Sequence, residues 1–458
     1  MNLDIVVLAA GKGTRMRSNM AKVLHKLSGR SLITHVMSTA AQLSPRHIAV
    51  VVGHQAQDVM THLGEGPVWV EQAEQLGTGH AVKLAMKSLA SDGVTLILYG
   101  DVPLVSLDAL KRCVSAANAG EVGLITANFS DPAELGRIIR DENGNITAIT
   151  EYKDASEAER QICEINSGIM AVPSQKLNEW LARIEPNNTQ GEYYLTDIIA
   201  MAAGEGVSIR GVLTTSPEEV TGVNDRAQLA ELERVNQRWL AERLMRNGVT
   251  IADPTRLDIR GELKTGQDCF IDINAVFEGN VTIGDDVTIG PGVVIKNSQL
   301  GNGVQVHAHT VIEGASIAND CSVGPFARIR PGTRMDDGVK IGNFVETKQT
   351  HLGAGSKAGH LTYLGDATLG ENCNVGAGTV TCNYDGIDKH STDIGNNVFV
   401  GTNSTLIAPI QIEDNAFIAA GTTVTTKVSS GDLAVGRAKQ RNISGWVRPG
   451  KRSKSKRN

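Results

Sequence analysis

Short apolar runs recur through the first half of the chain, and each run is bounded by polar residues or glycine. Near-continuous apolar runs are typical of strands that are buried on both faces, as in a parallel sheet. Helix-like stretches, such as residues 32–43 and 80–90, lie between the runs. Strands that alternate with helices predict βαβ units and an α/β fold. The clearest apolar runs are residues 5–8, 48–52, 96–99 and 123–126.

From about residue 250 onward, aliphatic residues recur with a period of six. A strand has a period of two and a helix a period of 3.6, so neither explains this pattern. It fits a parallel β-helix whose short strands form three flat faces, with one aliphatic residue per face pointing inward. The inward positions are Ile271, Phe277, Ile283, Ile289, Ile295, Leu300, Val306, Ile312, Ile317, Val323, Ile329, Ile341, Leu369, Val375, Ile394, Val400, Leu406, Ile412, Ile418 and Val424.

Three further segments complete the organisation of the chain. Residues 226–247 carry apolar side chains three or four apart and end at Asn247-Gly248, which predicts one helix that connects two domains. Residues 382–393 break the six-residue register, so we expect an external loop on the binding face of the solenoid. We therefore predict domains at 1–225 and 248–458, and interpret the basic residues 448–458 as a disordered, solubilising tail.

Composition narrows the class of protein. Aromatic residues make up only 4% of the 458 residues, whereas there are 49 glycines, as expected if a narrow β-helix interior excludes most aromatic rings. The net charge of −6 argues against nucleic-acid or membrane-surface binding, and no apolar stretch is long enough for a membrane span. The N-terminus does not resemble a signal peptide. Six cysteines without a CxxC pair favour reduced thiols in a cytosol.

Glycine-rich segments follow two of the predicted strands. Residues 8–16 (LAAGKGTRM) can present backbone N–H groups to phosphate oxygens, with Lys12 and Arg15 adding positive charge. The segment matches neither the P-loop nor the dinucleotide fingerprint, and a plain strand-to-helix turn is the alternative. Residues 72–81 (QAEQLGTGHA) suit contact with a base or a phosphate, or form an ordinary loop before a helix.

Asp101 lies at the end of an apolar strand, in the sequence Tyr99-Gly100-Asp101. In open α/β sheets ligands bind at the carboxyl ends of strands, so this carboxylate is a candidate Mg²⁺ ligand that faces phosphates. A cap for the following helix is the alternative interpretation.

Taken together, these motifs resemble those of sugar-phosphate nucleotidyltransferases: LAAGxGTRM at 8–16, AKVL at 21–24, QxxQLGTGHA at 72–81 and YGDxPL at 99–104. The segments GHLTYLGD at 359–366, GAGT at 376–379 and CNYDG at 382–386 are more specific. With the six-residue repeat, they are similar to the bacterial family of bifunctional N-acetylglucosamine-1-phosphate uridyltransferase/glucosamine-1-phosphate N-acetyltransferases. The resemblance implies a Rossmann-like α/β domain, a linker helix and a left-handed parallel β-helix.

For the first domain, the resemblance implies uridylyl transfer from UTP to N-acetylglucosamine 1-phosphate with release of pyrophosphate. Alignment and charge neutralisation are the main requirements of this reaction. Arg15 and Lys22 would neutralise the phosphates, and Asp101 and Asn224 would hold Mg²⁺. The nucleotide and sugar would contact Leu8, Ala9, Ala10, Gly11, Lys22, Gln72, Gly77, Thr78, Tyr99, Gly100, Asp101, Gly136, Glu151, Asn166 and Asn224.

For the β-helix, the resemblance implies acetyl transfer from acetyl-CoA to the amine of glucosamine 1-phosphate. A protonated amine cannot attack, and His360 is the expected base. Glucosamine 1-phosphate would contact Arg330, Lys348, Tyr363 and Asn374. Acetyl-CoA would contact Ala377, Asn383, Tyr384, Thr402, Ala420 and Arg437.

The resemblance also implies a cytoplasmic homotrimer whose acetyltransferase sites lie between β-helices, with the 382–393 loop reaching a neighbouring subunit. The product would feed peptidoglycan and lipopolysaccharide precursors. Three residues depart from the family pattern: Leu135 replaces a tyrosine, Ser167 a threonine and Thr402 a serine. Two alternatives stay open, namely a glucose-1-phosphate nucleotidyltransferase whose β-helix only oligomerises, and a non-catalytic assembly subunit.

Overall fold

The computed structural model describes residues 2–449 and divides them into two compact units. The first unit comprises the chain up to Arg243 together with Leu257–Gly261, and the second comprises the rest of the described chain. The basic tail predicted for residues 448–458 lies outside the described residues from position 450 onward. In the described part of the chain, no helix combines the length and apolarity needed to cross a membrane.

The first unit is built on a mostly parallel sheet in the order β11-β7-β10-β6-β1-β4-β5, with β8 and β9 beside β10. Its strands are β1 (Leu3–Leu8), β4 (His47–Val52), β5 (Val68–Glu71), β6 (Val94–Tyr99), β7 (Val122–Asn128), β8 (Arg137–Arg140), β9 (Ile146–Thr150), β10 (Glu164–Pro173) and β11 (Ile209–Leu213). The apolar runs of the sequence become β1, β4, β6 and β7, which confirms the α/β prediction.

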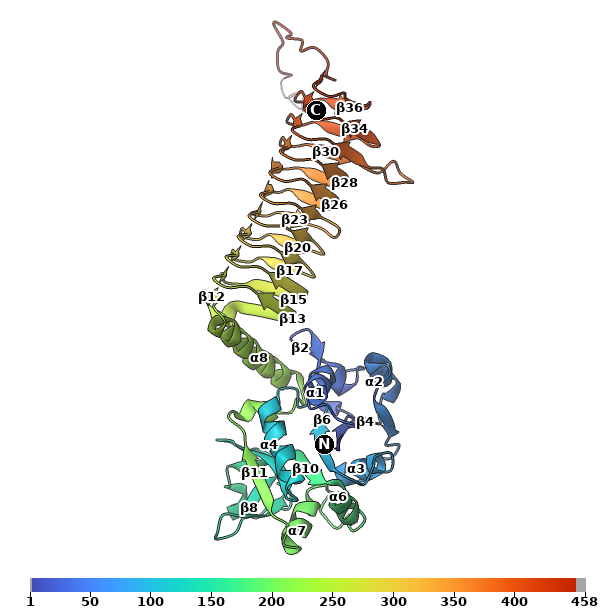
Figure 1. Ribbon diagram of the computed structural model, residues 1–458, viewed down its shortest axis with the longest axis vertical. Coiled ribbons are helices and arrows are strands. Elements are labelled where there is room, and N and C mark those ends of the chain that lie inside the picture. Colours follow the sequence, from blue (N-terminus) through green and yellow to red (C-terminus); the bar gives the residue numbers. More distant parts are fainter. Residues whose placement is uncertain (1, 450–458) are drawn as a thin grey trace, which may run out of the picture. The chain divides into compact units, whose positions relative to one another are not determined.

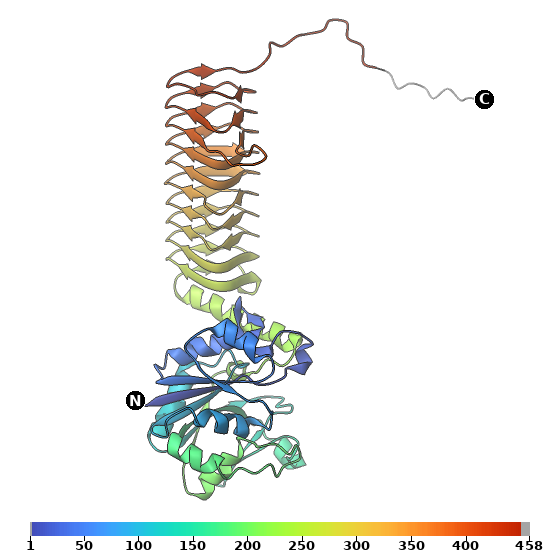
Figure 2. The same ribbon diagram turned by 90° about the vertical axis from the view of Figure 1, so that its right-hand side faces the viewer.

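Helices cover both faces of this sheet (Figures 1 and 2). Alternate residues of β1 face opposite ways, so Ile5 and Val7 pack in one core and Val6 packs in the other. The helices are α1 (Leu32–Ala41), α2 (Ala56–Leu63), α3 (Thr78–Met86), α4 (Leu107–Asn118), α5 (Glu157–Arg160), α6 (Ser174–Leu181), α7 (Asp197–Gly204) and α8 (Arg226–Arg246), with short 3₁₀ turns η1 (Thr14–Met16), η2 (Lys22–Leu24), η3 (Pro217–Val220) and η4 (Pro254–Arg256).

Strand β10 runs antiparallel to its neighbours β6 and β7, which the sequence pattern does not predict. The chain leaves β7 at its carboxyl end, forms the β8–β9 hairpin there and re-enters the sheet from the same edge. Glu164 therefore pairs with Asn128, and residues Asn166–Gly168 lie at the edge where β6 ends at Tyr99. This topology brings the start of β10 to the carboxyl edge of the parallel strands.

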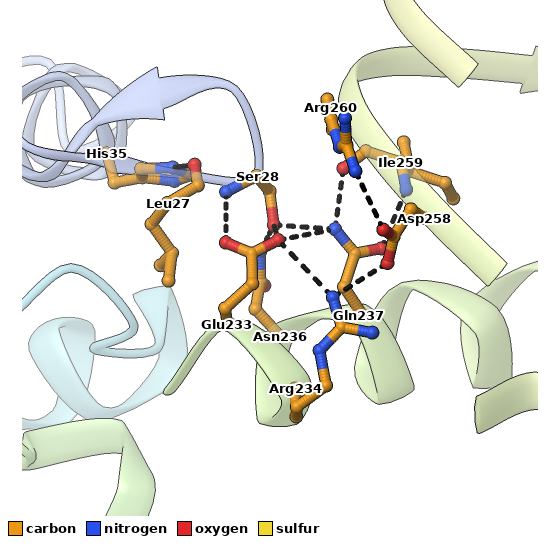
Figure 3. A network of polar contacts seen from close by, with 10 residues as sticks. All are labelled: Leu27, Ser28, His35, Glu233, Arg234, Asn236, Gln237, Asp258, Ile259 and Arg260. Carbon is orange, nitrogen blue, oxygen red and sulfur yellow. Dashed lines mark hydrogen bonds and ion pairs between the residues drawn. The ribbon is translucent and has the colours of Figure 1, made fainter. Parts of the chain in front are cut away.

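Helix α8 agrees with the prediction of a helix at 226–247, and its residues up to Arg243 belong to the first unit. Figure 3 shows its contacts with the hairpin formed by β2 (Lys26–Leu27) and β3 (Arg30–Ser31). The buried Gln237 amide accepts from the Ile259 N–H at 2.8 Å and donates to the Ile259 carbonyl at 2.7 Å. Glu233 accepts from the Ser28 N–H at 2.6 Å. Residues 258–260 are thus held against α8, outside the predicted range 1–225.

The second unit is a parallel β-helix whose coils stack one on another (Figure 1). One face is a separate sheet: β12 (Thr250–Ile251), β14 (Phe270–Ile271), β16 (Thr288–Ile289), β19 (Gln305–Val306), β22 (Ser322–Val323), β25 (Lys340–Asn343), β27 (Lys357–His360), β29 (Asn374–Val375), β32 (Phe399–Val400), β35 (Phe417–Ile418) and β37 (Leu433–Ala434). We call it the first face.

The two other faces join into one sheet through long strands such as β15 and β28. This sheet contains β13 (Leu257–Thr265), β15 (Ala275–Ile283), β17 (Val294–Lys296), β18 (Gln299–Leu300), β20 (Val311–Glu313), β21 (Ser316–Ile317), β23 (Arg328–Ile329), β24 (Arg334–Met335), β26 (Glu346–Leu352), β28 (Tyr363–Leu369), β30 (Val380–Cys382), β31 (Thr392–Ile394), β33 (Thr405–Ile407), β34 (Ile410–Ile412) and β36 (Thr423–Val424). We call it the joined sheet.

The six-residue repeat marks the interior of the β-helix as predicted. Every inward position named above is less than 5% exposed, and these residues fill the narrow core. Val306 pairs with Ile289 in one neighbouring coil and with Val323 in the other, so a coil takes 17 residues here. The predicted external loop also forms, because the residues between β30 and β31 leave the coil and expose Ile387.

A substitution pair on β16 tests this packing. Ile289→Ala removes a fully buried side chain and leaves a cavity, so we expect it to lower the free energy of unfolding of the nearby coils by about 2–5 kcal/mol. Thr288→Ala, at the exposed neighbouring position, should change it by less than about 0.5 kcal/mol. Hydrogen exchange of the β16 and β19 amides measures both effects. Equal exchange in the two variants would contradict the assignment of the inward face.

Candidate active sites

A cavity of about 320 Å³ lies at the carboxyl edge of the parallel strands in the first unit. The ends of β1 and β6, the glycine-rich turn after β1 and the start of α3 converge there, as expected for a ligand site in an open α/β sheet. The lining residues are Leu8, Ala9, Ala10, Gly11, Lys22, Val23, Gln72, Gln75, Gly77, Thr78, Ala81, Tyr99, Asp101 and Glu192. Most of the residues predicted for nucleotide binding are therefore brought together.

Two glutamine amides brace the loops that frame this cavity. The side chain of Gln75 donates to the Ala10 carbonyl at 2.6 Å, and that of Gln72 donates to the Gly77 carbonyl at 3.1 Å. Gln72 is buried, so its amide is fixed by its surroundings. Gly77 has a φ of +109°, and a Cβ there would meet the Tyr193 carbonyl oxygen at 2.6 Å, so only glycine fits this turn. The backbone N–H groups of both loops are therefore held in fixed directions.

Lys22, Asp101 and Asn224 form one polar cluster beside the cavity. The Lys22 ammonium makes an ion pair with Asp101 and hydrogen bonds to the Asn224 side-chain oxygen at 3.3 Å. Asp101 and Asn224 thus direct two oxygens to one point. Mg²⁺ is commonly bound by one or two protein oxygens together with substrate phosphates, so this donor set fits Mg²⁺. In the described part of the chain, no cluster of three or more His, Cys, Asp or Glu side chains suits a metal ion.

A second group of predicted residues gathers beside Tyr99 but does not line the cavity. Gly136 lies so close to Glu151 that a Cβ would meet its Oε2 at 3.2 Å, and the Asn166 N–H donates to the Gly136 carbonyl at 2.9 Å. Burial raises the pKa of Glu151, which accepts a hydrogen bond from Thr196 at 3.2 Å. Burial, together with the charges of Glu151 and Asp101, also raises the pKa of Tyr99. Tyr99 is therefore close both to Asp101 at the cavity and to Glu151 in the second group of residues.

Some site residues fall outside the sequence prediction. Gln75, Val23, Ala81 and Glu192 line the cavity but were not predicted to bind. Gln75 lies within the 72–81 motif, so the motif carried a signal for it, whereas no motif surrounds Glu192. Arg15 is exposed on η1 and does not line the cavity, and neither do Gly100 and Asn224.

In the second unit, several predicted residues fall at one equivalent position of successive coils. His360, Ala377, Thr402 and Ala420 each lie two residues after the paired inward residues Ala358, Val375, Val400 and Ile418 of the first face. Arg437 joins this set because its guanidinium donates to the Ala420 carbonyl. We call these positions the corner column. From the imidazole of His360 the corner column continues along the small side chains of Ala377, Thr402 and Ala420.

The residues predicted to bind the sugar phosphate lie mostly on the joined sheet. Arg330 pairs with Glu346 at 2.7 Å, Lys348 lies 3.8 Å from Asp366, and Tyr363 begins β28 directly after the His360 corner. Glu346 and Tyr363 are paired residues of adjacent strands, so these groups form one polar patch. Asn374 is separate from this patch, because it lies on β29 of the first face in the column of Lys357 and Phe399.

The residues predicted for acetyl-CoA divide into two places on one chain. One group belongs to the corner column and comprises Ala377, Thr402, Ala420 and Arg437. The other group, Asn383 and Tyr384, follows the last residue of β30 and therefore lies at the end of that strand away from the corner. Asn383 donates a hydrogen bond to Asp366, next to Lys348. Tyr384 is 60% exposed and donates to the Gly386 carbonyl at 2.6 Å.

Matches to protein families follow the same division of the chain. A MobA-like NTP transferase domain matches residues 5–161, and the bacterial transferase hexapeptide family with six repeats matches residues 391–426. The C-terminal domain of GMPPB matches residues 259–341. Fold and sites therefore define a nucleotidyltransferase joined to a hexapeptide-repeat transferase with a left-handed parallel β-helix.

Relatives over the full length identify the family. The chain is 52% identical to a bifunctional protein GlmU of Pseudomonas putida over 99% of this chain and 100% of that protein. It is 51% identical to a bifunctional protein GlmU of Marinobacter nauticus over 98% of this chain and 99% of that protein. An inositol-1-phosphate CTP transferase structure from T. maritima matches 50% of this chain and 96% of its own, with a TM-score of 0.39 and 17% identity. The chain belongs to the family of bifunctional GlmU proteins.

Gly168 offers a test of the first site. Its φ is +79°, and a Cβ at this position would lie 2.5 Å from Cε2 of Tyr99, so Gly168→Ala must displace the ring. We expect uridylyl transfer to fall on the order of 10²-fold, since small displacements of aligned groups have effects of this size. Gly144→Ala is the matched control, because Gly144 has a φ of +83° but open space around it. Equal losses in both variants would show that backbone strain alone is responsible.

Proposed function

We propose that the two reactions of this protein take place at the two sites described above, one in each unit. The protein is a bifunctional transferase that makes UDP-N-acetylglucosamine, first by acetyl transfer to glucosamine 1-phosphate and then by uridylyl transfer to the acetylated sugar phosphate. The single observation that carries this function is the match to GlmU proteins, which extends through both units at about half identity. Neither a single-activity enzyme nor a scaffold subunit accounts for that match.

In the uridylyl transfer, an oxygen of the sugar phosphate attacks the α-phosphorus of UTP and pyrophosphate leaves. The phosphate oxygen is already charged, so the protein needs no nucleophile of its own. The braced loops at Leu8–Gly11 and Gln72–Thr78 hold the nucleotide, and Lys22 neutralises its phosphates, with Arg15 approaching from η1. Gly136, Glu151 and Asn166 hold the N-acetylated sugar beside Tyr99 and Gly100. This arrangement supplies alignment and charge neutralisation.

The negatively charged phosphates of UTP require a divalent cation, and we assign Mg²⁺ to Asp101 and Asn224. Bound there, the ion would neutralise negative charge on the phosphates. The Lys22 ammonium contacts the same two side chains in the protein alone. Because two cations repel each other, we expect Lys22 to turn toward the nucleotide phosphates when the metal is bound. Lys22 thus holds the side chains of Asp101 and Asn224 in place before the metal ion binds.

In the acetyl transfer, the amine of glucosamine 1-phosphate attacks the thioester carbonyl of acetyl-CoA. A C–N bond forms, the C–S bond breaks, the amine proton moves to His360 and CoA leaves as the thiolate. Arg330 and Lys348 hold the sugar phosphate and Tyr363 orients the ring, while Asn374 approaches the sugar from the first face. The corner column binds acetyl-CoA along its small residues Ala377, Thr402 and Ala420 up to Arg437. His360 then lies where the two substrates meet.

We propose that the acetyltransferase site is completed by a second chain in a homotrimer. Asn383 and Tyr384 lie away from the corner column of their own chain, which suits contribution to a neighbour's site. An apolar set beside the column supports association, since Phe326, Phe344 and Leu361 are each at least half exposed and the two phenylalanine rings stack at 5.6 Å. A location in the cytoplasm is supported by its free cysteines and by UTP and acetyl-CoA as co-substrates.

One assay with two variants tests the assignment to separate sites. With glucosamine 1-phosphate, acetyl-CoA, UTP and Mg²⁺, release of free CoA thiol and of pyrophosphate is followed separately. We expect His360→Ala to lose thiol release by a factor of 10² or more while uridylyl transfer to supplied N-acetylglucosamine 1-phosphate continues. Asp101→Ala should do the reverse. Loss of both activities in either folded variant would contradict two independent sites.

Mixed assemblies test whether a second chain completes the acetyltransferase site. His360→Ala and Tyr384→Ala chains are each expected to be poorly active alone. When the two variants are co-expressed, a site that takes His360 from one chain and Tyr384 from the other is intact, so acetyl transfer should return. If the site lay within one chain, every site would carry a substitution and no activity would return.

A further inference from the structure

The imidazole of His360 contacts a side chain of the preceding coil. Strands β25 and β27 pair in parallel, and Asn343 is the register partner of His360. The side-chain oxygen of Asn343 lies 2.6 Å from Nδ1 of His360. Thr362, on the other side of the corner, fixes the backbone by donating to the His360 carbonyl at 2.7 Å. Both the ring and the main chain of His360 are therefore held.

The atoms of this contact determine which ring nitrogen is basic. An amide oxygen can only accept a hydrogen bond, so Nδ1 must carry the hydrogen. In a neutral imidazole the other nitrogen, Nε2, then has a free lone pair. We propose that Asn343 is a positioning residue for acetyl transfer, which keeps Nε2 of His360 as the nitrogen that accepts the amine proton. This inference rests on the proposed role of His360 as the base.

The side chains that flank His360 in the two neighbouring coils are uncharged. In the stacked coils its neighbours are Asn343 of the preceding coil and Ala377 of the following coil, and neither side chain titrates. The charged residues of the packed strands are Lys340 and Lys357, three positions earlier on β25 and β27. Tyr363 follows three positions later, across the corner on β28, and its register partner Glu346 on β26 is paired with Arg330. Asn343 is thus the side chain that sets the tautomer.

The choice of an amide at position 343 also has a physical reason. A carboxylate there would stabilise the protonated imidazolium and keep the base occupied by a proton at neutral pH. A neutral acceptor orients the ring without that effect, so the imidazole can take up the amine proton during the reaction. A carboxylate at position 343 should therefore shift the pH dependence of acetyl transfer, whereas an apolar residue there should lower its rate.

Two substitutions at Asn343, measured in the full-length protein, test the proposal. Asn343→Leu removes the acceptor, and we expect kcat for acetyl transfer to fall at least about tenfold with KM for both substrates unchanged. Asn343→Asp keeps an acceptor, and the acidic limb of its pH–rate profile should move about one pH unit or more to higher pH, with activity recovered above that limb. Gln299→Leu, an exposed amide on β18, is the control for an added leucine on the outer surface.

The results separate this proposal from the role of His360 itself. An unchanged kcat in Asn343→Leu, or a pH–rate profile of Asn343→Asp that superimposes on that of the unaltered protein, would overturn the proposal. If Asn343→Leu does not fold, as judged by thermal unfolding and by uridylyl transfer, the pH–rate profile of Asn343→Asp decides alone. Retained acetyl transfer in His360→Ala would instead remove the base on which the inference rests.

Discussion

Parallel main-chain pairing is the constraint on which both sites depend. Parallel strands lie about 4.8 Å apart and place equivalent residues side by side. In the first unit, β1 pairs in parallel with β6 and β4, so Leu8 and Tyr99 end at one edge and their loops meet around a cavity. In the second unit the same pairing stacks coil on coil. A single histidine there acquires neighbours from residues 17 positions earlier and later in the chain.

Stacking imposes a strict division of roles on each coil of the β-helix. The inward positions of the six-residue repeat are aliphatic apart from Phe277, and they are almost completely buried. On the strands, the hydrogen bonds between coils join main-chain atoms, so outward strand residues can vary. At several turns, by contrast, an outward Asn or Asp side chain accepts a main-chain N–H of the preceding coil, as Asn302 does from Asp285. Reactive residues can therefore occupy outer columns without loss of core packing. The corner column, with His360 at its start and small residues beyond it, makes use of this freedom.

The two sites manage charge in different ways. At the proposed nucleotide site, Lys22 forms an ion pair with Asp101, and burial raises the pKa of the half-buried Tyr99 and Glu151. At the β-helix site, the cations Arg330 and Lys348 are matched by Glu346 and Asp366 on adjacent strands, while His360 contacts a neutral amide. A phosphate ligand and a proton acceptor make opposite electrostatic demands. In the roles proposed above, Arg330, Lys348 and His360 meet both demands within a few successive coils.

The sequence by itself determined the architecture and much of the chemistry, because both are written in local patterns. The six-residue period marks the inward residues, and apolar runs mark β1, β4, β6 and β7. The glycine-rich and Tyr-Gly-Asp motifs located the cavity for the same reason. The antiparallel entry of β10, the lining by Glu192 and the contact between Asn343 and His360 depend on residues that are distant in the chain. Only the tertiary structure decided these, because pairing register, not sequence spacing, sets which side chains meet.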